Sequence, residues 1–169
     1  MGADNPGAER DIEKHLGSLE SLLREIIGAS PFRLTFSIQK ATAHPGDPDS
    51  PEYVVDFNGP DADFLLEMNA TLLHALEHVL LKAIRLEDDH LHRIAFDCKD
   101  WRLTRIGELQ LMAQVAAERV IDTGSPFTLS PMNARERRIV HLALKDQTLV
   151  QTQSEGTGPE RKVMIFPKK

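Results

Sequence analysis

The order in which helix-like and strand-like stretches follow one another is the feature that most limits how this chain can fold. Apolar residues that recur every three or four positions are typical of an amphipathic helix, and strict alternation is typical of a half-buried strand. These patterns predict helix, strand, strand, helix, helix and strand, at Glu9–Gly28, Phe32–Ala41, Tyr53–Phe57, a short stretch after Asp61, Thr71–Arg85 and Arg93–Cys98. The two early strands are expected to form a hairpin, so the order predicts an α+β unit.

A long helix separates this first part from the rest of the chain. Its apolar residues, Leu111 and Val115 among them, are expected to face a core. Beyond it the pattern predicts a short helix after Asn133 and two strands, Thr148–Thr152 and Lys162–Phe166, joined by a glycine-rich turn. The predicted organisation is a disordered tail, a first domain, a connecting helix and a small second α/β domain, at residues 1–8, 9–99, 100–124 and 125–169.

The composition favours a cytoplasmic protein. The single cysteine, Cys98, cannot form an internal disulfide, which is typical of a reducing compartment. No apolar run approaches the roughly 18 residues that a transmembrane helix needs. The polar N-terminus resembles no signal peptide. We therefore expect a soluble cytoplasmic chain without a membrane span.

The net charge of −6 hides a strong asymmetry between the two parts of the chain. Residues 119–169 carry nine Lys and Arg against five Asp and Glu, a balance of +4, whereas residues 1–118 carry a balance of −10. Such a division suggests a basic binding module that follows an acidic region.

The basic residues of the C-terminal part gather around one short helix. Asn133 is a good N-cap residue for this helix. Arg137 and His141 lie four residues apart, so their directions differ by about 40° and both leave the same helix face. A guanidinium offers a rigid fork of donors to a phosphate, and an imidazole donates a hydrogen bond or stacks on a base. Four further residues are expected to support this pair if the last strands pack on the helix: Arg135, Arg138, Arg161 and Lys162.

A second motif lies in the predicted helix Thr71–Arg85. The stretch His74-Ala75-Leu76-Glu77-His78 fits the H-x-x-E-H pattern of zinc peptidases, in which the histidines hold the metal. Apolar neighbours such as Leu72 and Val79 are expected on the buried face, which leaves the histidines on the polar side. No distinctive third-ligand motif follows. We therefore expect neither metal nor cofactor, and a zinc hydrolase is kept only as an alternative.

Three stretches near the C-terminus carry a family resemblance: Arg135–Leu144, Val150–Gly156 and Pro159–Ile165. They resemble the bacterial Jag family, whose members end in a single-stranded nucleic-acid-binding domain named for an Arg-x-x-x-His signature. That signature matches here at Arg137 and His141. The resemblance implies that these two residues contact nucleic acid.

In the same family a type II KH domain precedes the signature domain, and the order of elements predicted for residues 9–99 agrees with one. The family's GxxG loop lets bare backbone approach phosphates. Here its place falls on Glu67-Met68-Asn69-Ala70, which has no glycine and no basic residue. We therefore assign no nucleic-acid-binding residue to this degenerate loop.

The sequence thus predicts a non-enzymatic cytoplasmic protein that binds single-stranded RNA or DNA, with RNA favoured. An alternative is a protein-interaction or dimerisation module, in which the acidic KH-like half contacts a protein partner or a second copy and RNA binding is vestigial.

Overall fold

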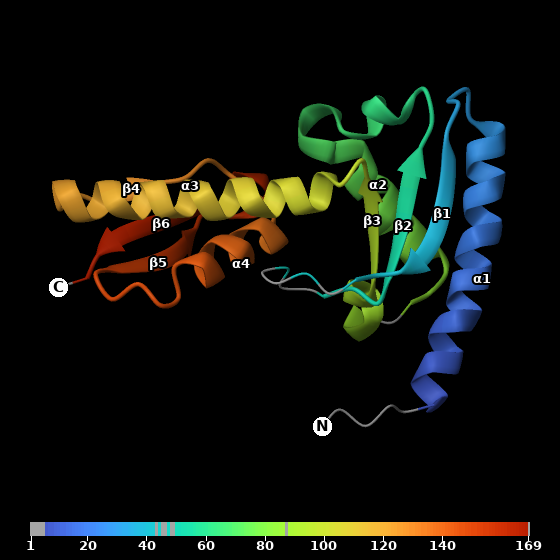
Figure 1. The fold of residues 1–169 in the computed structure, drawn as a ribbon, viewed down its shortest axis with the longest axis horizontal. Helices are drawn as coiled ribbons and strands as arrows, with labels where there is room; N and C mark the ends of the chain where they lie inside the picture. The colour runs from blue at the N-terminus through green and yellow to red at the C-terminus, as the bar shows by residue number, and fades with distance from the viewer. Residues whose placement is uncertain (1–5, 43, 45–46, 48–49, 87, 169) are drawn as a thin grey trace. The chain divides into compact units, whose positions relative to one another are not determined.

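The computed structural model describes residues 6–42, 44, 47, 50–86 and 88–168. The chain forms two compact units, Met1–Thr42 with Asp49–Trp101 and Ala43–Pro48 with Arg102–Lys169. Each unit combines helices with one three-stranded sheet (Figure 1). The predicted α+β class is therefore confirmed.

The first unit follows the predicted order of elements. Its helices, strands and short 3-10 turns are α1 Pro6–Ala29, β1 Thr35–Lys40, β2 Tyr53–Asn58, η1 Ala62–Leu65, α2 Glu67–Ala83, η2 Asp88–Arg93 and β3 Ile94–Cys98. Strands β1 and β2 are antiparallel, as the predicted hairpin requires, and β3 lies parallel to β2. The KH-like character of this unit stays a prediction.

The start of α1 differs from the prediction. The helix begins at Pro6, three residues before Glu9, so Pro6–Ala8 are helical and do not belong to the predicted tail. Proline is favoured in a first helical turn because the amide that it lacks has no partner there in any case. Residues 1–5 lie outside the described part of the chain.

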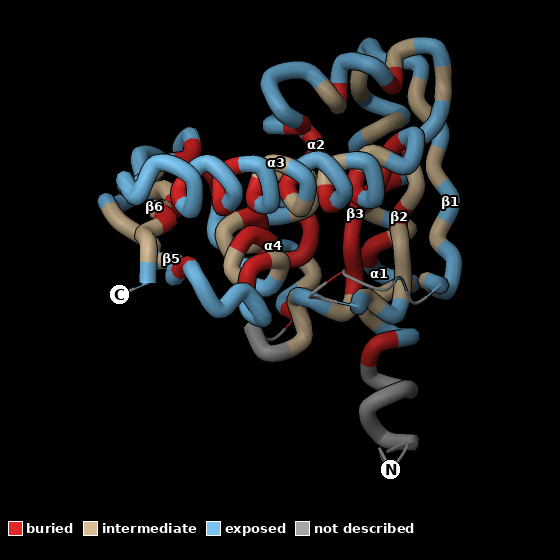
Figure 2. Tube along the Cα trace, turned by 60° about the vertical axis from the view of Figure 1, so that its left-hand side comes forward, coloured by how far each residue is buried: buried red, intermediate tan, exposed pale blue. Residues whose placement is uncertain are grey.

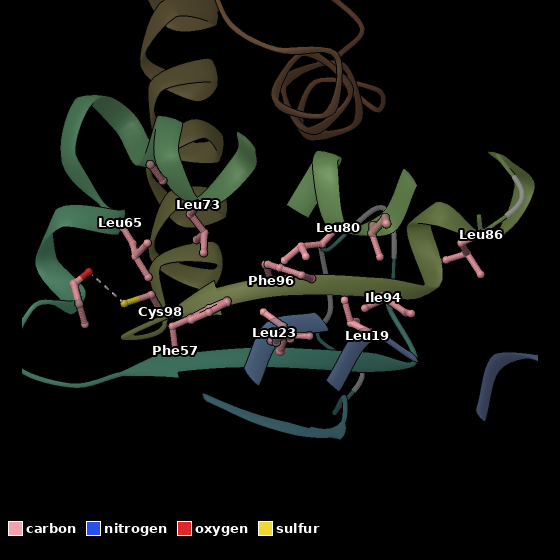
Figure 3. Close-up of a cluster of buried hydrophobic side chains, with 14 of the residues drawn as sticks. Leu19, Leu23, Phe57, Leu65, Leu73, Leu80, Leu86, Ile94, Phe96 and Cys98 are labelled. Carbon is pink, nitrogen blue, oxygen red and sulfur yellow. Dashed lines mark hydrogen bonds between the residues drawn. The ribbon is translucent and has the colours of Figure 1, made fainter. Parts of the chain in front are cut away.

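The core of the first unit lies between its sheet and its helices. Figure 3 shows Leu23 of α1 toward Phe57 of β2, Leu19 of α1 near Ile94 of β3, and Leu80 of α2 near Phe96 of β3. Every residue of β3 is buried. Burial removes these apolar side chains from water and thereby stabilises the first unit.

A break in α2 falls at the position of the degenerate loop. Met68, Asn69 and Ala70 adopt left-handed backbone angles, with φ of 50°, 61° and 56°. Each such angle costs a non-glycine residue roughly 1–2 kcal/mol. The regular helix thus breaks where the degenerate loop was placed, although the sequence has no glycine there to relieve the strain.

The second unit contains α3 Trp101–Thr123 from Arg102 onward, since Trp101 groups with the first unit. Its other elements are β4 Phe127–Thr128, α4 Ala134–Ala143, β5 Val150–Glu155, the short turn η3 Gly158–Glu160 and β6 Lys162–Pro167. Its sheet has the order β4-β6-β5, and both pairings are antiparallel. Strand β5 begins two residues later than predicted and extends to Glu155.

Helix α3 is part of the second unit, although residues 100–124 were predicted as a connecting helix between two domains. Its buried residues lie in one core with Ile139 of α4 and Ile165 of β6: Ile106, Leu109, Ala113, Ala116, Ala117 and Val120. The segment Arg102–Lys169 of the second unit therefore includes all of this helix except Trp101.

The buried face of α3 also differs from the predicted one. Leu111 and Val115 were expected to face the core, yet they are 63% and 57% exposed. Figure 2 shows buried and exposed positions on opposite sides of this helix. Three alanines, Ala113, Ala116 and Ala117, occupy the buried side instead. Small side chains let a helix approach its neighbours closely, and a ranking by hydrophobicity alone misses this effect.

All the buried side chains of the second sheet point to one face. Val150, Val163 and Ile165 lie in the core with α3 and α4. Because successive side chains of a strand point to opposite faces, the remaining positions point away from both helices. We call this second surface the open face; it comprises Thr128, Gln151, Gln153, Glu155, Lys162, Met164 and Phe166.

Candidate nucleic-acid interface

The first turn of α4 is fixed by a complete capping box, which confirms the predicted N-cap. The backbone amide of Glu136 donates to Oδ1 of Asn133 over 2.9 Å, and the amide of Asn133 donates to Oε2 of Glu136 over 3.0 Å. Arg105 of α3 donates from Nε to the buried Glu136 carboxylate over 2.8 Å. These bonds hold the helix, and therefore the direction of every side chain on it.

His141 lies against two hydroxyl groups of β5. Its Nδ1 is 2.6 Å from Oγ1 of Thr152, and its Nε2 is 2.9 Å from Oγ of Ser154. A neutral imidazole has one donor and one acceptor nitrogen, and hydroxyls complement either. Burial, followed by the charge of Arg137, lowers the pKa of His141. The site therefore holds a neutral histidine whose two nitrogens are both engaged.

Thr152 and Ser154 did not emerge from the sequence as site residues. They sit two positions apart, so both point toward α4 from the same face of β5. Two hydroxyl residues at alternate positions of a strand could have identified this part of the site. That pattern becomes informative only when the histidine-bearing helix is known to pack on the strand.

Arg137 lies beside the main chain that precedes α4. Its Nη1 donates to the carbonyl of Met132 over 2.9 Å, and the amide of Met132 donates to the carbonyl of Arg161 over 3.0 Å. The main chain of Met132 thus lies between the side chain of Arg137 and the main chain of Arg161. Arg138 and Arg161 are exposed, and Arg137 is half-buried.

Arg135 lies in a different environment from the one predicted. Its Nη2 is 3.3 Å from Oδ1 of Asp47, whose other oxygen accepts a 2.6 Å bond from the buried Arg102. Asp47 groups with the second unit. Because the guanidinium of Arg135 is directed to this buried carboxylate, we do not group Arg135 with Arg137 and His141.

Lys162 lies on the far side of the sheet from His141. It pairs with Glu155 across β5 and β6, whereas Ser154 pairs with the buried Val163. Lys162 therefore belongs to the open face and does not join Arg137, contrary to the prediction.

The H-x-x-E-H stretch of α2 lies beside an aromatic ring. The ring of His74 packs against Trp101 with centroids 5.2 Å apart. Across the described residues no group of three or more His, Cys, Asp or Glu could hold a metal ion. The buried face of α2 carries Leu73 and Leu80, whereas Leu72 and Val79, which were predicted inside, are exposed. The zinc hydrolase gains no support here.

The environment of His141 predicts a pH dependence of stability. Because its folded pKa lies below the ordinary value of about 6.5, the unfolded chain binds the proton more readily. The titration of His141 therefore leaves the free energy of unfolding undiminished above about pH 6.5 and lowers it as the pH falls below that value. Thermal unfolding at pH 7.5 and 5.5 should show a smaller pH effect for His141→Gln than for the wild type. Identical pH profiles would show that His141 titrates normally.

Comparisons with known proteins bear on the second unit most directly. A model of the R-3-H domain, the domain named for the Arg-x-x-x-His signature, matches residues 107–167, a range that begins inside α3. A protein of Clostridium symbiosum named RNA-binding protein KhpB is 30% identical over 118 residues, 70% of this chain and 53% of that protein. The protein of that name in Bacillus subtilis is 28% identical over 113 residues, 66% of this chain and 54% of the other.

A third protein named RNA-binding protein KhpB, from Lactiplantibacillus plantarum, is 36% identical over 76 residues, 45% of this chain and 24% of that protein. The chain spans at most about half the length of these curated relatives. Within the described residues no helix has the length and apolar character needed to cross a membrane.

Proposed function

The chain belongs to the Jag family of R-3-H-domain proteins, and on this basis we propose that it is a non-catalytic cytoplasmic protein that binds single-stranded nucleic acid, RNA in preference to DNA. The observation that carries the proposal is the pair Arg137 and His141 on one face of α4, where Arg137 donates to the carbonyl of Met132 and the amide of Met132 donates to the carbonyl of Arg161. The names of the relatives, which describe RNA-binding proteins, support RNA over DNA.

Each group on this surface has a distinct role in the proposal. Arg137 and Arg161 attract phosphates, since a guanidinium keeps its charge and offers several donors. His141 stays neutral and acts mainly by holding the hydroxyl of Ser154 in place. That hydroxyl is then directed for a hydrogen bond to a phosphate or a ribose. The capping box keeps the whole helix face rigid, which lowers the ordering cost of binding.

The salt dependence of binding should distinguish Arg137 from His141. Replacing Arg137 by alanine removes one charged phosphate contact, so affinity should decrease about tenfold and the salt slope by about 0.7. Replacing His141 by alanine should weaken binding above pH 7 without changing the slope, because the lost group is neutral. Fluorescence anisotropy with labelled single-stranded RNA at several salt concentrations measures both quantities.

The control for this experiment is Arg24→Ala, which removes an exposed arginine of α1 that pairs with Glu20. It should leave RNA affinity unchanged. Equal affinities of the wild type and an Arg137→Ala/His141→Ala double variant would contradict the assignment of the surface.

A second candidate function is a protein-interaction module in the first unit. It is favoured by the exposed apolar residues of α2, Leu72 and Val79, which are 40% and 59% exposed. Sedimentation of the purified chain tests self-association: a single monomeric species that binds RNA would count against a dimer.

A further inference from the structure

We propose that the open face of the second sheet binds the bases of the same nucleic-acid strand whose phosphates contact α4. The inference rests on the proposed function and extends it to a second surface. It assigns base contact to Phe166 and Met164 of the central strand, with Gln151 and Gln153 beside them.

The register of the sheet places these side chains next to one another. Phe166 pairs with Gln151 and Met164 with Gln153 across β5 and β6. On the other side Met164 pairs with Thr128 of β4. Directly paired residues on one face have Cβ atoms about 4.5–5.5 Å apart. The open face therefore has an apolar centre flanked by amide and hydroxyl groups.

Neither Phe166 nor Met164 is part of the hydrophobic core of its unit. The side chains that form or border that core come from the opposite face of the sheet, as Val163 and Ile165 do. Phe166 and Met164 are half-buried, and Gln151, Gln153 and Thr128 are exposed. An aromatic ring and a thioether thus lie, half-buried, on the central strand of a sheet face that neither α3 nor α4 covers, and we infer that a ligand can reach them.

The chemistry of this face suits unpaired bases. Aromatic side chains on a sheet stack bases, a mode that tolerates any sequence because every base has a π-face. The amides of Gln151 and Gln153 each offer a donor and an acceptor, which match the polar edges of bases. A duplex would not fit, since its bases are already stacked and paired.

Basic residues connect this face to the phosphate surface on α4. Arg161 follows η3, and its carbonyl accepts from the amide of Met132, to whose carbonyl Arg137 donates, while the next residue, Lys162, points to the open face. The alternation continues beyond the strand to Lys168, whose amide donates to Leu149. Lysines thus stand at both ends of the Met164–Phe166 centre, and the acid on this face is Glu155 opposite Lys162. A single strand that contacts Arg137 passes around the start of β6 at Arg161 and Lys162.

Substitution of Phe166 in the full chain tests this proposal. Phe166→Leu keeps an apolar side chain but removes the aromatic ring, whereas Phe166→Tyr keeps the ring. The affinity for a labelled single-stranded RNA should decrease about tenfold for Phe166→Leu and stay close to the wild-type value for Phe166→Tyr. Thermal unfolding of both variants checks that the fold is retained, and sedimentation checks the oligomeric state.

Photo-crosslinking gives a readout that a purely structural effect would not produce. RNA that contains 4-thiouridine should crosslink to the wild-type chain within Val163–Lys168 as well as near α4. Crosslinks near α4 alone, or equal affinities of Phe166→Leu and the wild type, would overturn the inference while the proposed function stands. No RNA binding by the wild type would overturn both. A change of oligomeric state in Phe166→Leu without a change of affinity would assign the face to a protein contact and overturn the inference.

Discussion

Replacing Leu109 by alanine is expected to destabilise the second unit by about 3 kcal/mol. Leu109 is fully buried on α3, in one core with the sheet and α4. Its truncation removes apolar contacts and leaves a cavity that rigid neighbours fill only in part. Had α3 been a solvated connection between two domains, the same change would cost almost nothing.

The matched control lies two residues further along the same helix. Leu111 is 63% exposed, so Leu111→Ala should change the stability of the unit by at most about 0.5 kcal/mol. Leucine and alanine both favour helices, and the two changes therefore differ mainly in burial.

Hydrogen exchange is the appropriate measurement for this pair of variants, because a chain with two units need not unfold in one step. Amides of β5 and β6 should lose protection in Leu109→Ala and keep it in Leu111→Ala. Amides of β2 and β3 in the first unit should be unaffected by either change. Equal protection of β5 and β6 in both variants would show that α3 contributes little to the second unit.

Replacing Asp47 by asparagine is expected to cost the second unit about 3–5 kcal/mol. The Asp47 carboxylate accepts a 2.6 Å bond from Arg102 and lies 3.3 Å from Arg135. The side chains of Arg102 and Asp47 are only 6% and 5% exposed. Asparagine keeps the size of the side chain but removes its charge, which leaves the buried Arg102 guanidinium without this carboxylate.

An exposed ion pair supplies the control for Asp47. Glu20 pairs with Arg24 over 2.6 Å on α1, with side chains 46% and 70% exposed. Glu20→Gln should cost at most about 0.5 kcal/mol, because solvent screens such pairs. Urea unfolding followed by hydrogen exchange of α4 amides compares the two. A loss for Asp47→Asn as small as that for Glu20→Gln would show that the buried pair is not needed for stability.

Local patterns in the sequence predicted much of this protein correctly. The change from helical to strand periodicity identified the elements of the first unit and the antiparallel hairpin. Asn133 identified the start of α4, because its cap involves only neighbouring residues. The spacing of Arg137 and His141 placed both on one helix face for the same reason.

The environment of the basic residues required the tertiary structure. The sequence grouped Arg135 and Lys162 with Arg137 by charge and proximity along the chain. Arg135 pairs instead with Asp47, 88 positions away in sequence, and Lys162 points to the other face of its sheet. The two hydroxyls that hold His141 come from β5, which no helical spacing identifies.

The sequence by itself determined which segments are helices and strands and which residues share a helix face, since these depend on contacts within a few residues. The tertiary structure alone decided that α3 belongs to the second unit and which charges remain at the surface. The three buried alanines of α3 contribute through close packing. Ion pairs form wherever the folded chain brings opposite charges together. Both effects depend on distances between segments that no local pattern contains.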